Sequence, residues 1–201
     1  MNQSDDLHIN QAIATLNGGG VVAFPTDTVY GVGVDPFQPE AVRKLYKIKG
    51  RPIDKPIPIL VGSTDDVERV AQNLPSTFSQ LAERFWPGGL TLIVEAKALP
   101  PEVTAGGDTV GIRMPDHPLA LALLQRFGGA IATTSANKSD EPPATSAEEV
   151  QSELGALVGI ILDGGQTATR IASTVLDLSV SPPQIRRQGG ISIGQLSPFI
   201  S

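Results

Sequence analysis

The chain has 201 residues and a formal net charge of −6, with 40% hydrophobic and 18% charged residues, which favours one globular domain with its own core. The absence of cysteine excludes disulfides, thiolate metal sites and cysteine nucleophiles, and two histidines, His8 and His117, are too few for a histidine-rich metal site. The acidic N-terminus lacks the apolar segment of a signal peptide, and no apolar run approaches the ~20 residues of a membrane span. The sequence therefore predicts a soluble, cytoplasmic protein with no membrane partner.

Apolar runs that suit strands alternate along the chain with segments of helical spacing. Ile9, Ile13 and Leu16 recur at helical intervals, and a run of three glycines from Gly18 ends that helix. The predicted strands are 21–26, 57–61, 90–95, 109–114, 130–137, 158–163, 173–178 and 183–187. The further predicted helices are one from Pro39, one after Ser63, 75–85, 118–127, 146–154 and a short one after Gly190. This alternation predicts a single-domain α/β protein.

The segments between these elements carry turn and capping residues. The expected loops are 26–33, 96–108 and 138–145. The first of them, TDTVYGVG, places hydroxyls, a carboxylate and two glycines where a strand ends, which is where open α/β sheets bind ligands. Ser63, Asp116 and Ser146 are the predicted N-caps of the helices that follow them.

The segment KGRPIDKP, residues 49–56, belongs to a concentrated basic stretch. From Arg43 to Lys55, six of the chain's fifteen basic residues occupy thirteen positions against one acid, so this window carries +5 and the rest of the chain −11. Pro52 and Pro56 fix φ at their own positions and favour extended conformations at the residues before them. The pattern predicts a segment that holds an anion, and a solvated basic helix end is the alternative.

Sequence signatures of common catalytic sites are missing. The chain has no G-x-x-x-x-G-K-[ST] loop and no G-x-G-x-x-G, G-x-S-x-G, H-E-x-x-H or C-x-x-C motif, and we interpret both histidines as solvated or capping residues. Polar clusters at strand ends are what is left: Thr26, Asp27, Thr28 and Tyr30; Lys49, Arg51 and Lys55; Thr109 and Arg113; Thr133, Thr134, Ser135 and Asn137; Ser173 and Thr174; Arg186 and Arg187. Such groups suit phosphoryl or nucleotidyl transfer by positioning and charge neutralisation. The alternative is that the Ser and Thr residues only form turns.

Six segments together resemble one known family over residues 8–195. They read FPTDTVYGVG, KGRP followed by KP, WPGGLT, GGDTVGIRMPDHP, TTSAN, and STVLDL followed by PQIRR. In this order they are similar to the YrdC/Sua5 family of L-threonylcarbamoyladenylate synthases, whose K-x-R…S-x-N signature matches Lys49-x-Arg51 and Ser135-x-Asn137. The resemblance implies a twisted mixed parallel and antiparallel sheet, flanked by helices, around a positively charged concave cleft. It is closest to the short type, a single YrdC-like domain over residues 1–201 without the C-terminal domain of longer members.

The resemblance also implies a reaction. L-threonine, bicarbonate or CO₂, and ATP would give threonylcarbamoyl-AMP and pyrophosphate, for the N6-threonylcarbamoyl modification of adenosine 37 in tRNA. ATP would be a substrate and would carry Mg²⁺, with no metal held by the protein. The implied partners are tRNA or double-stranded RNA and the downstream threonylcarbamoyl-transferase proteins.

Site residues follow from the same resemblance, position by position. Lys49 and Arg51 are the implied catalytic pair, in contact with phosphate and carbamate oxygens. The implied contacts of threonine and its carbamate are Thr28, Arg113, Ser135 and Ser173. The implied ATP contacts are Lys49, Arg51, Pro52, Pro56, Thr109, Asn137, Thr145 and Arg187. Arginine suits the threonine carboxylate because its guanidinium can bind a carboxylate through two hydrogen bonds.

The chain departs from the longer family members at one site position. Where some of them place a histidine that contacts threonine, this chain has Leu60. Without a C-terminal domain, the irregular segment 138–145 is our candidate for a lid over the cleft. Two other functions stay open: a double-stranded RNA or tRNA-binding module of the same fold, and carbamoyl transfer from carbamoyl phosphate. The proteins that perform the latter carry a zinc finger, which this cysteine-free chain lacks.

Overall fold

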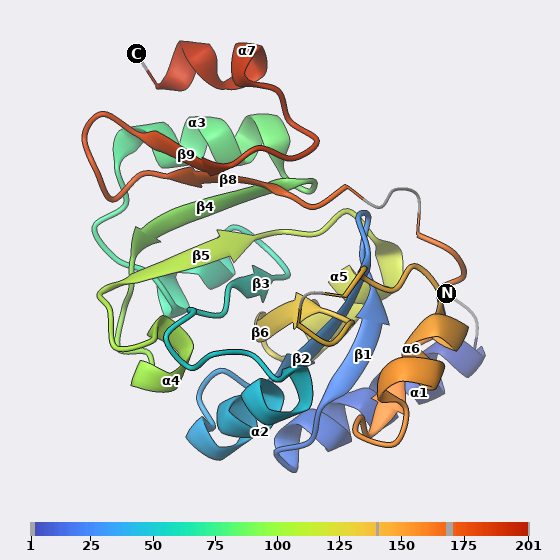
Figure 1. The fold of residues 1–201 in the computed structure, drawn as a ribbon. Coiled ribbons are helices and arrows are strands. Elements are labelled where there is room, and N and C mark those ends of the chain that lie inside the picture. The colour runs from blue at the N-terminus through green and yellow to red at the C-terminus, as the bar shows by residue number, and fades with distance from the viewer. Residues whose placement is uncertain (1–2, 140, 168–170, 201) are drawn as a thin grey trace.

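The computed structural model describes residues 3–139, 141–167 and 171–200 (Figure 1). The helices are α1 (Gln3–Asn17), α2 (Pro39–Lys49), α3 (Ser76–Phe85), α4 (Pro101–Thr104), α5 (Pro118–Phe127), α6 (Ala147–Leu154) and α7 (Ile193–Leu196), and the 3-10 turns are η1 (Asp65–Arg69) and η2 (Ser197–Phe199). The strands are β1 (Val22–Pro25), β2 (Tyr30–Val34), β3 (Ile59–Val61), β4 (Leu90–Glu95), β5 (Thr109–Arg113), β6 (Ala130–Ser135), β7 (Ile160–Ile161), β8 (Thr174–Asp177) and β9 (Gln184–Arg187).

All of these strands join one sheet in the order β7-β1-β2-β6-β3-β5-β4-β8-β9. The pairs β1–β7, β3–β5 and β4–β8 are parallel, and the other neighbours are antiparallel. The predicted α/β fold with a mixed sheet flanked by helices is therefore confirmed. None of the helices in the described chain has the length and apolarity that crossing a bilayer requires.

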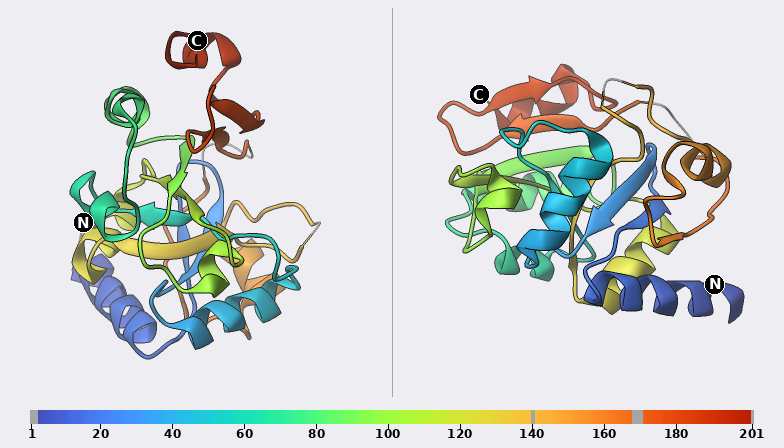
Figure 2. Two further views of the ribbon diagram at one scale, coloured as in Figure 1. Left: turned by 90° about the vertical axis from the view of Figure 1, so that its left-hand side faces the viewer. Right: turned by 60° about the horizontal axis from the view of Figure 1, so that its bottom comes forward.

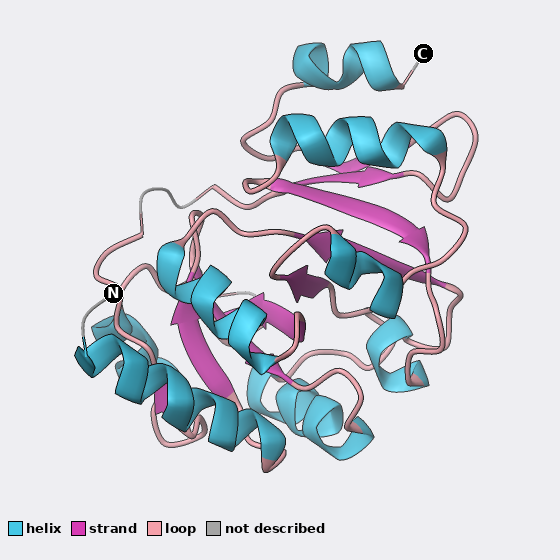
Figure 3. Ribbon diagram, turned by 180° about the vertical axis from the view of Figure 1, so that it is seen from behind, coloured by secondary structure: helices cyan, strands magenta, loops and turns pink. Residues whose placement is uncertain are grey.

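The two faces of the sheet are covered differently. The larger core lies on the face that receives Val32, Ile59, Leu92 and Ile112, and it includes apolar residues of α2, α3, α4 and α6. A smaller core on the opposite face holds Leu60 and side chains from α1 and α5, two helices that pack against each other (Figure 3). This second core contains no residue of β4, β5, β8 or β9. The helices α1 and α5 therefore leave the part of the face formed by these strands uncovered.

The two ends of the chain lie far apart. Both views in Figure 2 place α1 at one end of the molecule and the C-terminal α7 at the other. The C-terminal turn packs on α3, where the rings of Phe85 and Phe199 meet edge to face at 6.0 Å. Residues 191–200 therefore extend the larger core beyond the edge of the sheet.

The predicted loop 26–33 contains a strand, which is a correction. β2 begins at Tyr30, because Tyr30, Val32 and Val34 face the larger core. The glycines between them lie against β6, where a Cβ at Gly31 would come within 2.8 Å of Thr133 Cγ2. A glycine at every second position hid the strand, since alternation of apolar and polar side chains is the usual signal.

Three local predictions are also wrong. Asp116 does not cap α5: the N-cap is His117, which makes no side-chain capping bond, and the backbone N–H of Asp116 donates to Asp27 instead. The expected loop 96–108 contains the single helical turn α4. Ser63 accepts a bond from the backbone N–H of Asp66, but the N-cap residue is Thr64, and the element that follows is the 3-10 turn η1 and not the predicted helix. The predicted cap at Ser146 is confirmed by the N–H of Glu149.

Candidate functional site

A cavity of about 490 Å³ occupies the part of the second sheet face that α1 and α5 leave uncovered. This volume lies within the range of small-molecule sites. Alternate strand residues face it, because successive side chains point to opposite sides of a sheet. They are Gly31 of β2, Leu60 of β3, Thr91 and Ile93 of β4, Gly111 and Arg113 of β5, Thr133 and Ser135 of β6, Val175 of β8 and Arg187 of β9.

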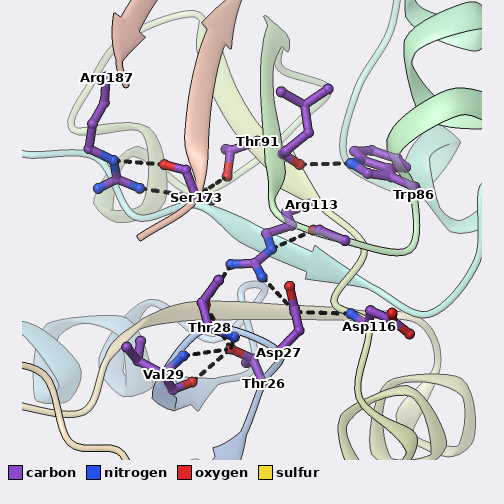
Figure 4. Close-up of polar contacts among 12 residues, drawn as sticks. Thr26, Asp27, Thr28, Val29, Trp86, Thr91, Arg113, Asp116, Ser173 and Arg187 are labelled. Carbon is purple, nitrogen blue, oxygen red and sulfur yellow. Dashed lines mark hydrogen bonds and ion pairs between the residues drawn. The ribbon is translucent and has the colours of Figure 1, made fainter. Parts of the chain in front are cut away.

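Arg113, the last residue of β5, is 7% exposed and lines this cavity. Its Nε donates to the carbonyl of Gly88 at 2.9 Å, Nη1 to Thr28 Oγ1 at 3.1 Å, and Nη2 to Asp27 Oδ1 at 2.6 Å (Figure 4). Burial lowers the pKa of Arg113, and the charge of Asp27 opposes that effect. The guanidinium is thus fixed in orientation by three protein acceptors and keeps two of its five N–H groups.

The turn between β1 and β2 supplies those partners. Thr26 Oγ1 donates to the carbonyl of Val29 at 2.7 Å and lies 3.0 Å from Thr28 Oγ1, which leaves Thr28 to donate to Thr26 while it accepts from Arg113 (Figure 4). Asp27 Oδ1 also accepts the backbone N–H of Asp116 at 3.0 Å. The turn is therefore tied to β5 and to the start of α5 at the wall of the cavity.

A second set of polar side chains lies across the cavity, on β4, β8 and β9. Ser173 Oγ lies 2.8 Å from Thr91 Oγ1 and accepts from Arg187 Nη2 at 3.0 Å, while Arg187 Nε donates to the Ser173 carbonyl at 3.0 Å (Figure 4). Burial lowers the pKa of Arg187, and the charges of Arg113 and Arg51 lower it further.

The segment KGRPIDKP curls at the end of α2 and places Arg51 on the cavity. Gly50 ends the helix in the left-handed conformation, with φ of 60°. Arg51 then folds back over the segment, where Nε donates to the carbonyl of Lys55 at 3.1 Å and Nη2 to that of Pro56 at 2.9 Å. The two prolines thus belong to a short loop that the arginine itself closes.

Lys49, the last residue of α2, is 3% exposed and is not among the residues that line the cavity. Its ammonium donates to the carbonyl of Ser135 at 2.6 Å, to Asn137 Oδ1 at 3.0 Å and to the carbonyl of Asn137. Burial, followed by the charge of Arg51, lowers the pKa of Lys49 to about 8. Because an ammonium has three protons, these acceptors use its full donor capacity.

Asn137 is held as firmly as Lys49. Its Nδ2 donates to the carbonyls of Lys138 and Glu141, both at 2.7 Å, and the N–H of Ser139 donates to the carbonyl of Lys49 at 2.9 Å. The described part of the proposed lid segment 138–145 is thus tied to α2 directly by the bond between Ser139 and Lys49, and indirectly through Asn137. Residue 140 lies outside the described residues.

The cavity brings together eight of the predicted site residues: Thr28, Arg51, Pro56, Arg113, Ser135, Asn137, Ser173 and Arg187. Four others are not among the lining residues: Lys49, Pro52, Thr109 and Thr145. Thr109 lies at the start of β5, opposite Glu95, and the buried Thr145 donates through its N–H and hydroxyl to Glu149 Oε2. The contacts assigned to all twelve residues stay predictions.

Several lining residues had no assigned role from the sequence. Thr91, Gly111, Leu60 and Glu141 line the cavity. Glu141 is the acidic lining residue, against three arginines. Alternation along β4 could have pointed to Thr91, since it is the polar residue between two apolar ones, whereas the position of Glu141 depends on how the loop after β6 folds.

Among the described residues, neither His117 nor a group of metal-binding side chains belongs to this site. His117 does not line the cavity, its Nδ1 has no hydrogen-bond partner among the described residues, and burial lowers its pKa against the opposing charges of Asp27 and Asp116. Within residues 3–139, 141–167 and 171–200, no three His, Asp or Glu side chains are grouped so that they could hold a metal ion.

Comparisons with known proteins place this cavity in context. The family model for Sua5, YciO and YrdC proteins, described as "Telomere recombination", matches residues 14–189. A threonylcarbamoyl-AMP synthase of Bacillus subtilis is 45% identical over 199 residues, which are 98% of this chain and 58% of that protein. The chain therefore spans a little more than half the length of that curated relative.

Two solved structures resemble the fold closely. Pyrococcus abyssi Sua5, complexed with L-threonine, has a TM-score of 0.92 and 39% identity, covering 96% of this chain and 57% of that one. Escherichia coli YciO has a TM-score of 0.86 and 25% identity, covering 98% of this chain and 95% of that one.

Proposed function

Because the chain belongs to the Sua5/YciO/YrdC family, we propose that it is an L-threonylcarbamoyladenylate synthase. It adds CO₂ to the amine of L-threonine with loss of a proton, or takes the carbon from bicarbonate with loss of water, and joins the resulting carbamate to the AMP part of ATP. The products are threonylcarbamoyl-AMP and pyrophosphate. The product serves the N6-threonylcarbamoyl modification of adenosine 37 in tRNA, which downstream transferase proteins complete. The support from relatives is that proteins similar over nearly the whole chain carry this name, and that one similar structure holds L-threonine.

The observation that carries the proposal is the convergence of Arg51, Arg113 and Arg187 on one cavity lined with hydroxyls. Two anions, a carbamate and a triphosphate, must meet in the reaction, and fixed cations make their approach favourable. Burial, followed by the charges of Arg113 and Arg51, lowers the pKa of Arg187, which supports the proximity of the three charges around this cavity. A protein nucleophile is unnecessary, since the carbamate of threonine is itself the attacking group.

On the amino acid side, Arg113 binds the threonine carboxylate with its two remaining N–H groups. Thr28 and Ser135 supply hydroxyls beside it, and Ser173, held by Thr91 and Arg187, supplies another. Fixing the guanidinium in advance reduces the entropy cost of binding. Leu60, next to Arg113 in the β3–β5 pairing, presents an apolar surface to the substrate.

On the nucleotide side, Arg51, Pro56, Asn137 and Arg187 line the region assigned to ATP. One carbamate oxygen attacks the α-phosphorus, the bond from that phosphorus to the bridging oxygen breaks, and pyrophosphate leaves with the electron pair. Arg51 and Arg187 neutralise the charge that develops on the phosphate oxygens. Mg²⁺ enters on ATP as part of the substrate.

The proposal is tested by incubating the protein with L-threonine, bicarbonate and Mg-ATP, and by measuring pyrophosphate and the adenylate. We expect pyrophosphate release that requires threonine, together with a product that contains both threonine and AMP. Threonine-independent ATP hydrolysis, or no turnover by folded protein, would contradict the proposal.

The RNA-binding alternative gains less support from the structure. Of the six cations in the window 43–55, Arg43 pairs with Glu40 and Glu102, Lys49 is buried and Arg51 lines the cavity. Lys44, Lys47 and Lys55 are left for a phosphate backbone, and RNA affinity with its salt dependence rises with the number of such contacts. Salt-dependent RNA retention that ATP and threonine leave unchanged would favour this alternative.

A further inference from the structure

Among the described residues, Asp27 is the carboxylate that accepts a hydrogen bond from the Arg113 guanidinium. It lies behind this arginine and between two lining residues, Thr26 and Thr28, without itself being a lining residue, and the proposed reaction gives it no role so far. Its side chain is 20% exposed and forms an ion pair with Arg113, with 2.6 Å between Oδ1 and Nη2. Both recorded hydrogen bonds of this carboxylate, from Arg113 and from the N–H of Asp116, end on Oδ1. Within the described residues, Oδ2 accepts no hydrogen bond, and it is not a fully buried atom that lacks a partner. Within the described part of the chain, Oδ2 is thus an unused acceptor on a partly exposed side chain.

Arg113 has N–H groups that no described residue accepts. Three of the five guanidinium N–H groups are used by Gly88, Thr28 and Asp27, which leaves two, the number that a carboxylate takes in a bidentate pair. A ligand carboxylate bound there lies next to Asp27, and like charges at that distance repel. The repulsion is removed when the ligand carries a positive group next to its own carboxylate.

We propose that Asp27 accepts the α-ammonium group of the amino acid substrate while Arg113 holds its carboxylate, an inference that rests on the proposed function. In an α-amino acid both groups are attached to one carbon, so a ligand held by Arg113 brings its ammonium within reach of the aspartate that pairs with this arginine (Figure 4). The four charges then alternate in sign. Asp27 selects amino acids over carboxylic acids that lack the amino group.

Neighbouring acids do not fit this role. Glu141 is exposed on the segment after β6 and its backbone carbonyl, not its side chain, is tied to Asn137. The side chain of Asp116 is exposed at the start of α5, and only its backbone N–H contacts Asp27. Asp27 is the acid fixed against Arg113, so its carboxylate keeps its place when a ligand enters.

The experiment compares two ligands that differ by one group, L-threonine and (R)-3-hydroxybutanoate, which keeps the carboxylate and the hydroxyl but has no amino group. Binding of each is measured by calorimetry or NMR titration to the wild-type protein, to Asp27→Asn and to the matched control Asp116→Asn. We expect Asp27→Asn to weaken L-threonine about tenfold or more, because this ligand loses a charged hydrogen bond. Hydroxybutanoate should bind equally well or more tightly, because its carboxylate loses a repulsive neighbour. The control should change neither ligand.

Each other outcome overturns the inference. Equal losses for both ligands would mean that Asp27 only orients Arg113, and no loss for either would mean that it contributes nothing. If the wild-type protein does not bind L-threonine, both the proposed function and this inference are wrong. If the wild-type protein binds L-threonine but Asp27→Asn affects both ligands equally, only the inference is wrong. If Asp27→Asn does not fold, Asp27→Glu keeps the charge for Arg113 but moves the acceptor, and the same threonine-selective loss is expected.

Discussion

Arg113 and Lys49 are the two basic residues that the described part of the chain buries, and their surroundings differ in charge. Arg113, at the end of β5, lines the cavity, has a carboxylate partner in Asp27 and keeps two N–H groups that no described residue accepts. Lys49, at the end of α2, gives all three of its protons to neutral oxygens of Ser135 and Asn137 and does not reach the cavity lining.

This difference separates two tasks within one site. A cation with free donors at the cavity is placed to bind a ligand, so we propose that Arg113 contacts the substrate directly. A cation whose donors are all used inside the protein acts through what it holds, here the backbone of Ser135 and the side chain of Asn137. The family-based assignment of Lys49 to phosphate contact would require Lys49 to give up at least one of these bonds. The predictions for Arg113→Ala and Lys49→Met below separate the two tasks.

The largest effect is expected from Arg113→Ala. The substitution removes both remaining donors for the threonine carboxylate and leaves Asp27 without its ion-pair partner. We expect KM for L-threonine to rise about a hundredfold or more, with a much smaller change in KM for ATP. Pyrophosphate release, with each substrate varied at saturation of the other, measures both constants.

Arg187→Ala is the matched control for that prediction, because it removes a guanidinium from the same cavity on the opposite side. Its larger effect should fall on KM for ATP. If Arg113→Ala raised both constants equally, its assignment to the threonine carboxylate would be wrong.

Much of this molecule could be predicted from local patterns in the sequence. The core strands 90–95 and 109–114 appeared as β-branched runs, and the basic face of α2 appeared from the spacing of Val42 and Leu45. The membership of Arg51 and Arg113 in one site followed from the family resemblance, since the two residues are far apart in the chain and no local pattern connects them.

The chemical state of Lys49 could not be predicted in the same way. Its sequence position, at the end of a basic helix, favours an exposed cation that complements the helix dipole. Its burial depends on the loop after β6, whose carbonyls reach Lys49 only because β6 lies between β2 and β3 in the sheet. The strand β2 was missed for a related reason, since its glycines are required by contacts with Thr133 and Ile131 across the sheet.

A smaller effect, on stability, is expected from Lys49→Met. The variant removes the donor that three oxygens share, at a cost of about 1–3 kcal/mol for each buried acceptor left unpaired, and removal of a buried charge offsets part of that cost. We expect the free energy of unfolding to fall by about 2 kcal/mol, as measured by urea denaturation. Lys44→Met, on the exposed face of the same helix, is the control and should stay within about 0.5 kcal/mol. Equal changes in the two variants would mean that Lys49 holds nothing in place.

Counted per pH unit, the smallest effect is a dependence of stability on pH that Lys49 alone accounts for. Burial lowers its pKa from 10.5 to about 8, so between these pH values the unfolded chain binds more protons at this residue than the folded protein does. The free energy of unfolding therefore rises with pH across this range, by at most about 1.4 kcal/mol per pH unit. Wild-type protein should gain stability over Lys49→Met from pH 8 to pH 10.5, with a constant difference below pH 8. A difference that stays flat up to pH 10.5 would mean that the three oxygens hold the ammonium strongly enough to offset its burial.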